Sequence, residues 1–234
     1  MFYFDPRYLI FALPALLLAF YAQARVRSTY NRYSRKQNAR GLSGSEIARI
    51  LLRSAGLDHV HVETVGGNLS DHYDPAKNVL RLSKGVSENR SVASLGIVAH
   101  EVGHAMQDAT NYAPLRVRSG LVPAVRIGSW LGPIIFIVGF LLSGATGSTT
   151  IAWSGLFLFA GTGVFALITL PVGFNASNRA RALLRTYQLA DGQELQETKK
   201  VLDAAALTYV AALAQALSTL LYYVFLLTGF SRRD

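Results

Sequence analysis

The chain has 234 residues, of which 51% are hydrophobic and only 16% charged, and it contains no cysteine. Its 23 lysine and arginine residues outnumber its 14 acidic residues, which gives a formal net charge of +9. This composition excludes an intrinsically disordered chain, because such chains are poor in apolar residues, and it excludes disulfide-stapled domains and cysteine-ligated metal sites. The shortage of charge instead suggests an integral membrane protein.

Four apolar segments reach or approach the roughly 20 residues that a helix needs to cross a bilayer core. They cover residues 8–24, 127–144, 149–172 and 204–230, and none contains a lysine, arginine, aspartate or glutamate. The first segment differs from a cleaved signal peptide, because its positive cluster follows the apolar run instead of preceding it. We therefore predict an uncleaved N-terminal anchor and four transmembrane helices.

The distribution of basic residues predicts the topology, because loops rich in lysine and arginine stay in the cytoplasm. Fifteen of them lie in residues 25–126 and five in residues 173–203, whereas only Arg7, Arg232 and Arg233 fall elsewhere. We therefore expect a multipass protein of the inner (cell) membrane, with these two segments cytoplasmic and both termini outside. The charge then reflects topology and attraction to the lipid bilayer, and we predict no nucleic-acid partner.

The segment after the first membrane helix is predicted to form a small α+β domain. Ser43 and Glu46 have the spacing of a helix capping box, and the apolar face that follows predicts a helix over 44–55. Two alternating strands are predicted over residues 59–63 and 78–83, with a turn-rich loop over residues 66–77 between them. A second helix is predicted over about 91–108.

The second predicted helix contains the sequence His100-Glu101-Val102-Gly103-His104, an HExxH motif. Residues four apart lie one turn apart on one helix face, so the two histidines can aim ring nitrogens at a single zinc ion. Glu101 lies next to them and can act as general base toward a zinc-bound water, whose pKa the metal lowers toward about 7. The alternative is a helix face with two merely hydrogen-bonded histidines.

Four phrases resemble the membrane-bound YugP-type neutral zinc metallopeptidases, and together they extend over nearly the whole chain. They are LSDHYDPAKNVLRLS, GIVAHEVGHAMQDATNYAPLRVRSGLVPAVRIGS, TLPVGFNASNRARALL and VLDAAALTYVAALAQAL. The resemblance implies an α-helical membrane protein with four transmembrane helices and a small α+β zincin-like cytoplasmic domain. It implies Zn²⁺ as cofactor, His100 and His104 as metal ligands and Glu101 as catalytic base.

The expected organisation has five parts. An N-terminal transmembrane anchor covers residues 1–24, and a cytoplasmic zincin-like domain with HExxH covers residues 25–126. A transmembrane hairpin follows over residues 127–172. A cytoplasmic helical segment completing the site covers residues 173–203, and a C-terminal transmembrane helix covers residues 204–234.

The resemblance also suggests where a peptide or protein substrate would bind. By analogy with heat-shock-type membrane zinc peptidases, the strand NVLRLS would be the edge strand above the metal and would hold an extended substrate by main-chain hydrogen bonds. The residues expected to contact substrate are Asn78, Val79, Leu80, Arg81 and Leu82. His72, in the family phrase DHYD, is a candidate for stabilising the oxyanion, and the alternative is a role in a turn.

The third ligand is the difficulty, because a catalytic zinc takes three protein ligands plus water. The family carries an acidic residue where this chain has Gly173, and analogy makes that acid the third ligand. Three interpretations stay open: compensation by a neighbour, a two-histidine site with weak or no zinc, or a substitution particular to this chain. The neighbours considered for compensation are Asp108, Asn175, Asp191, Glu194, Glu197 and Asp203.

Two functions from different classes follow. One is a zinc metallopeptidase that hydrolyses peptide bonds at the cytoplasmic membrane face. The other is a catalytically inactive pseudopeptidase that acts as a membrane scaffold or adaptor. An intramembrane protease is disfavoured, because the apolar run before His100 has only about nine residues and is too short to span a bilayer. The layout of anchor and hairpin suits a bacterial membrane.

Overall fold

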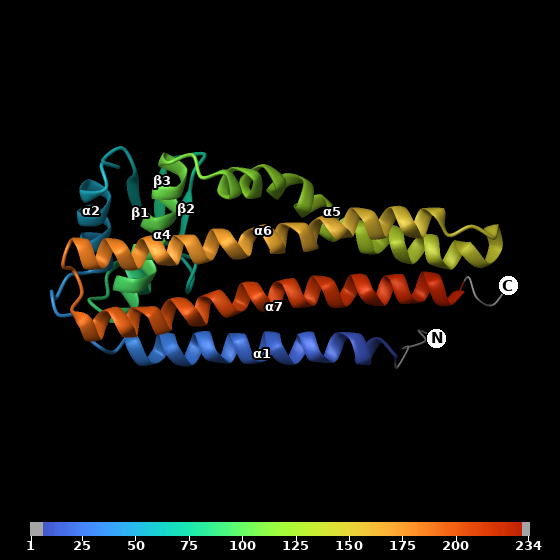
Figure 1. Cartoon of the computed structure of the whole chain (residues 1–234), viewed down its shortest axis with the longest axis horizontal. Coiled ribbons are helices and arrows are strands. Elements are labelled where there is room, and N and C mark those ends of the chain that lie inside the picture. The colour runs from blue at the N-terminus through green and yellow to red at the C-terminus, as the bar shows by residue number, and fades with distance from the viewer. Residues whose placement is uncertain (1–6, 231–234) are drawn as a thin grey trace. The chain divides into compact units, whose positions relative to one another are not determined.

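The structure is a computed structural model that describes residues 7–230. Arg232 and Arg233, which enter the topology prediction, lie outside the described residues. The elements in chain order are α1 (Arg7–Tyr33), α2 (Gly44–Ser54), β1 (His61–Val65), β2 (His72–Asp74), β3 (Val79–Ser83), α3 (Lys84–Ser87), α4 (Val92–Ala109), α5 (Ala113–Thr146), α6 (Thr150–Thr186) and α7 (Gly192–Phe230) (Figure 1).

Four helices, α1, α5, α6 and α7, are long and apolar enough to cross a membrane. The prediction of four membrane-spanning segments is confirmed to this extent, since one predicted segment falls on each helix. The helices continue beyond the apolar segments: α6 runs past Val172 to Thr186, and α7 begins at Gly192, before its apolar stretch. Most of residues 173–203 is therefore a continuation of two long helices.

The chain folds into two compact units, and each of the four long helices contributes to both. The polar unit comprises Ala22–Arg116 and Pro171–Leu207. The apolar unit comprises the chain up to Tyr21, Val117–Leu170 and the chain from Thr208 onward. The HExxH motif lies in the polar unit.

In the apolar unit, glycine residues allow α5 and α6 to pack with their backbones in contact. A Cβ atom on Gly139 would lie 2.3 Å from the backbone nitrogen of Ala152, and one on Gly155 would lie 2.3 Å from the backbone nitrogen of Phe136. Small residues at such crossings provide the close packing that lipid-facing helices need, because lipid gives no hydrophobic drive toward association. The Phe136 ring also stacks on Tyr223 of α7, with ring centroids 3.8 Å apart.

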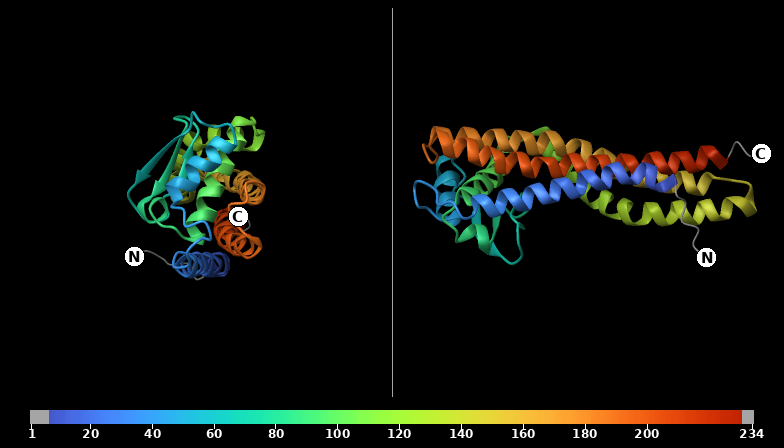
Figure 2. Two further views of the ribbon diagram at one scale, coloured as in Figure 1. Left: turned by 90° about the vertical axis from the view of Figure 1, so that its left-hand side faces the viewer. Right: turned by 90° about the horizontal axis from the view of Figure 1, so that it is seen from below.

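In the polar unit, a three-stranded sheet has the order β1-β3-β2 (Figure 2). β1 pairs parallel with β3, with His61 opposite Val79, and β2 pairs antiparallel with β3, with Tyr73 opposite Leu80. The prediction that NVLRLS is an edge strand is therefore wrong. Residues 72–74 belong to the segment predicted as a loop, but they form a short strand that pairs with the other side of β3. The edge strands of the sheet are therefore β1 and β2.

The core of the polar unit lies between this sheet and the helices α2 and α4. Both helices are close to the predicted ranges, and the capping box of Ser43 and Glu46 at the start of α2 is present in both directions. The core side chains include the fully buried Ile47 of α2, Leu80 of β3 and Val102 of α4. This packing fixes the orientation of α4, on which the HExxH motif lies.

Candidate active site

The three chemically important residues of HExxH lie together on α4. His100 and Glu101 are buried, with 7% and 8% of their surface exposed, and His104 is half-buried. The two imidazole rings have centroids 4.8 Å apart and are nearly perpendicular, at 84°. The two imidazole rings therefore lie against each other on one face of α4, and Glu101 follows His100 directly in the chain.

Gly103, inside the motif, lets α4 lie directly against the backbone of α6. A Cβ atom at this position would lie 2.5 Å from the carbonyl oxygen of Ala176. A larger residue would force the two helices apart. This close approach brings side chains of α6 to the histidine pair, although α4 and α6 are far apart in sequence.

Gln107 fixes the orientation and the tautomer of His104. Its Nε2 donates to the carbonyl oxygen of Val172 and to Oδ1 of Asn175, each at 2.9 Å, so its Oε1 is the acceptor. Nδ1 of His104 lies 2.9 Å from this Oε1 and must carry the proton in that hydrogen bond. The lone pair of neutral His104 is consequently on Nε2, the atom through which this tautomer could ligate a metal.

His100 has a corresponding contact with α6. Its Nδ1 lies 3.1 Å from Oγ of Ser177, a hydroxyl that can donate or accept, so this contact holds the ring against α6. Burial, together with the nearby His104, lowers the pKa of His100 to about 3. The imidazole is therefore neutral at pH 7, which is the form that binds metals. Neither Ser177 nor Gln107 was predicted as a partner of the histidines, although Gln107 is one turn beyond His104 on the same helix.

Glu101 is held by the edge strand of the sheet. Its Oε2 accepts a hydrogen bond of 3.0 Å from the backbone nitrogen of Tyr73 in β2. The hydroxyl of Tyr73 donates to Oδ2 of Asp108 at 2.9 Å, so this one residue contacts α4 at both ends of the motif. Burial, with the bonded Asp108 as a second cause, raises the pKa of the Tyr73 hydroxyl. The edge strand β2 thus contacts α4 at Glu101 of the motif.

The structure does not bring His72 to this site. Tyr73 faces α4, and neighbouring residues of a strand point to opposite faces, so His72 lies on the other face of the sheet. There Nδ1 of His72 lies 2.8 Å from the carbonyl oxygen of Ser70, and Nε2 lies 3.5 Å from the guanidinium of Arg81. This position fits the alternative role of His72 in the strand and its turn.

The residues predicted to bind substrate lie in the centre of the sheet. Residues 79–81 of β3 pair with β1 on one side and with β2 on the other. Their main-chain groups therefore face neighbouring strands on both sides. The prediction of substrate contacts for residues 78–82 assumed that this strand lies at an edge of the sheet, whereas β3 is central.

Gly173 lies on the face of α6 that is turned to the histidines. The contacts of Ser177 and Val172 with α4 show that the two helices run in opposite directions. Gly173 is buried and lies one helical turn before Ser177, which places it opposite His104. Residue 173 is thus on the face of α6 that contacts α4 near the motif, and as a glycine it offers no ligand atom from a side chain.

The acids and amides considered as substitutes have other partners. Asp108 accepts a hydrogen bond from the hydroxyl of Tyr73, and Oδ1 of Asn175 accepts hydrogen bonds from two side chains. Asp203 forms an ion pair with Lys199. Within residues 7–230, no group of three histidine, cysteine, aspartate or glutamate residues is arranged to hold a metal ion.

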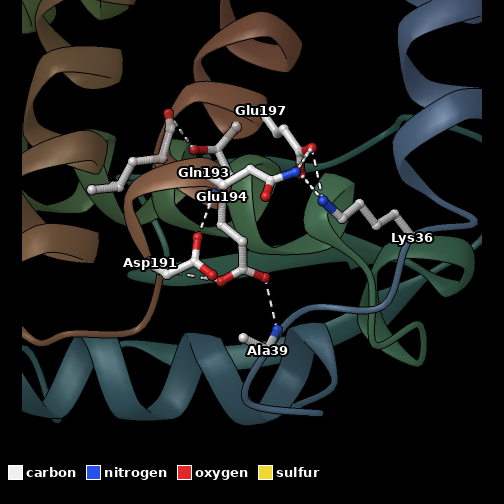
Figure 3. A network of polar contacts seen from close by, with 8 residues as sticks. Lys36, Ala39, Asp191, Gln193, Glu194 and Glu197 are labelled. Atoms are coloured by element: carbon white, nitrogen blue, oxygen red, sulfur yellow. Dashed lines mark hydrogen bonds and ion pairs between the residues drawn. The ribbon is translucent and has the colours of Figure 1, made fainter.

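The remaining acids tie the start of α7 to the segment after α1 (Figure 3). Glu194 accepts a hydrogen bond of 2.7 Å from the backbone nitrogen of Ala39 and forms reciprocal capping contacts with Asp191. Glu197 forms an ion pair with Lys36 at 2.7 Å. Compensation by a neighbour therefore finds no support among the described residues. Among the described residues, the two histidines of the motif are the candidates for the three protein ligands that a catalytic zinc takes, so the fit to the metal is partial.

Comparisons with known proteins agree with the motif. The profile of the family described as "Putative neutral zinc metallopeptidase" matches residues 8–228. The chain is also 41% identical over 217 residues to the "Putative membrane protease YugP" of Bacillus subtilis, and this match covers 93% of this chain and 95% of the relative. No solved structure matches the chain significantly.

Proposed function

This chain belongs to the neutral zinc metallopeptidase family, and on that premise we propose that it is a membrane-anchored, zinc-dependent peptidase. The observation that carries the proposal is the bond between His104 and Gln107. A buried amide whose Nε2 is already used twice holds the imidazole in the tautomer that presents Nε2 to a metal.

The roles of the motif residues follow from their positions. His100 and His104 are the residues that would hold a zinc ion through their imidazole rings, and a bound zinc would supply an activated water. The carboxylate of Glu101 would serve as the general base and would pass the proton to the leaving amine of the peptide. The hydrogen bond from the backbone nitrogen of Tyr73 to Oε2 orients this carboxylate.

The substrate site of the proposal is the edge strand β2. This strand is at the border of the sheet and meets α4 through Tyr73, so an extended peptide paired with it would pass the catalytic helix. The proposed substrates are membrane proteins or membrane-proximal segments, because the site is in a chain with four candidate membrane helices. We place the polar unit in the cytoplasm of a bacterial cell and both termini outside, on the basis of the distribution of basic residues.

A second candidate function rests on Gly173. With two protein ligands, the site holds zinc more weakly than a three-ligand site would, and a chain without zinc would be a pseudopeptidase that acts as a scaffold or adaptor. Metal content separates the two functions, because the scaffold needs none.

The test measures zinc per chain in protein purified in detergent and equilibrated with buffered zinc. The peptidase proposal expects close to one zinc per chain, lost in His100→Ala and retained in His59→Ala, which removes an exposed histidine outside the motif. Glu101→Gln should keep the zinc and lose about 10²- to 10⁴-fold in hydrolysis of a fluorogenic peptide. Wild-type protein that stays free of zinc and still binds a partner protein would refute the peptidase and support the scaffold.

A further inference from the structure

A groove with a volume of about 510 Å³ lies between the ends of α6 and α7 that belong to the polar unit. On α6, its walls are formed by Asn178, Arg181, Ala182 and Arg185. These positions have the spacing i, i+3, i+4 and i+7, so they form one continuous face of the helix. The two arginines are four residues apart on that face and are both exposed.

The facing wall has the same construction. On α7, the groove is lined by Gly192, Leu195, Gln196 and Lys199, again with the spacing i, i+3, i+4 and i+7. Two small residues, Ala182 and Gly192, leave room between the longer side chains. The groove therefore combines an open centre with three basic side chains and two primary amides at its sides.

The positive charge of the two arginines is not neutralised within the groove. No acidic residue lines it. Lys199 forms an ion pair with Asp203, whereas Arg181 and Arg185 form no ion pair with any residue of the described chain. The acids at the start of α7 are used elsewhere, since Glu194 binds the backbone of Ala39 and Glu197 binds a lysine. The groove thus has a net positive charge.

Guanidinium groups bind phosphate oxygens in a bidentate geometry, and two of them on one helix face can bind the same group from two directions. The volume of the groove falls in the range of small-molecule sites, which is about 300–1,000 Å³. We propose that the groove between α6 and α7 is a binding site for a phosphate-bearing anion, held by Arg181 and Arg185.

Two sources of phosphate share this chemistry. One is the headgroup of an anionic phospholipid, because Lys199 precedes the last apolar segment by only a few residues and basic pockets beside membrane helices bind such headgroups. The other is a soluble phosphate ester. Neither requires zinc or proteolysis, so the proposal stands or falls independently of the peptidase function.

The test uses the full chain and the double variant Arg181→Gln/Arg185→Gln, which removes both guanidinium groups but keeps good helix formers. Its matched control is Arg49→Gln/Arg53→Gln on α2, an exposed arginine pair with the same spacing and the same change in net charge. Binding is measured to nanodiscs of phosphatidylglycerol against phosphatidylcholine, by native mass spectrometry of retained lipid. Binding of glycerol 3-phosphate to detergent-solubilised protein is measured by calorimetry, and thermal unfolding verifies that all variants are folded.

The expected result is at least a tenfold loss of affinity in the α6 double variant and less than a twofold change in the α2 control. Loss in the nanodisc experiment alone identifies a lipid headgroup, and loss with glycerol 3-phosphate identifies a soluble ester; either supports the proposal. Equal losses in both double variants would show a general effect of net charge and would overturn it. Wild-type protein that binds neither probe would overturn it as well.

Discussion

The substitution Gly173→Glu restores an acidic side chain at the one position that the fold places opposite His104. Gly173 is buried on the face of α6 turned to α4, one turn before the residue that contacts His100. A glutamate carboxylate there would join the two imidazoles as a third ligand, so we expect the substitution to raise the affinity for zinc.

The magnitude follows from the number of ligands. Four-ligand structural zinc sites bind with about 10–16 kcal/mol, which is roughly 2.5–4 kcal/mol per ligand. A factor of ten in affinity corresponds to about 1.4 kcal/mol. Adding one ligand to the two that the chain provides should therefore strengthen zinc binding by about two to three powers of ten.

The assay is a competition titration of zinc against a chromophoric chelator, performed on purified wild-type protein and on Gly173→Glu. The matched control is Gly173→Gln, which has nearly the same size as the glutamate but carries a neutral amide, a poor zinc ligand. Cobalt substitution adds a spectroscopic readout, because the visible bands of cobalt report the number of ligands.

Equal zinc affinity in wild type and Gly173→Glu would refute the placement of residue 173 beside the metal. A gain in Gly173→Gln as large as that in Gly173→Glu would also refute it, because charge and ligation would then play no part. A gain confined to the glutamate variant, together with increased peptide hydrolysis, would identify Gly173 as the cause of a weak site.

Three further predictions test the surroundings of the motif. Gly103→Ala should destabilise the protein by about 1–3 kcal/mol in thermal unfolding, because the added Cβ would meet a carbonyl oxygen of α6 at 2.5 Å. The control is Gly120→Ala, which should show no such loss because its Cβ would contact nothing within 4 Å. Gln107→Leu removes the acceptor that orients His104 and should lower zinc affinity about 10- to 100-fold in the same titration, whereas Gln107→Glu, which keeps an acceptor, should lose less. Finally, the hydrogen bond from Arg81 lowers the pKa of Asp74 from its ordinary value of 3.8, so this carboxylate contributes stability above pH 3.8 that is lost as pH falls through the lower folded pKa. Asp74→Asn should therefore unfold at a lower temperature than wild type at pH 7, and the difference should disappear in strongly acidic buffer; a constant difference at all pH values would contradict this.

The sequence was sufficient for those features whose cause is local. Apolar segments of membrane length are recognisable because the bilayer imposes a length on each helix. The capping box of Ser43 and Glu46 and the helical spacing of His100 and His104 depend only on residues within one or two turns. Each of these predictions was close to the structure because helical hydrogen bonds connect residues that are near in sequence.

The sheet order depended on contacts that the sequence pattern does not contain. The three residues of β2 are too few for a periodic signal. They form a strand because β3 pairs with them and because Glu101 accepts a hydrogen bond from the backbone nitrogen of Tyr73. The same pairing turns His72 to the opposite face of the sheet. A pattern along one strand indicates which residues share a face, but it does not show whether a neighbour covers its edge.

The completeness of the metal site was likewise decided between α4 and α6. The sequence by itself determined that two histidines and a glutamate share one helix. Only the tertiary structure showed that Gly173 lies opposite His104, that Gln107 fixes the tautomer of this histidine, and that the other acids have different partners. The reason is physical: a metal site needs ligands from several directions, and these directions are set by how helices distant in sequence pack against one another.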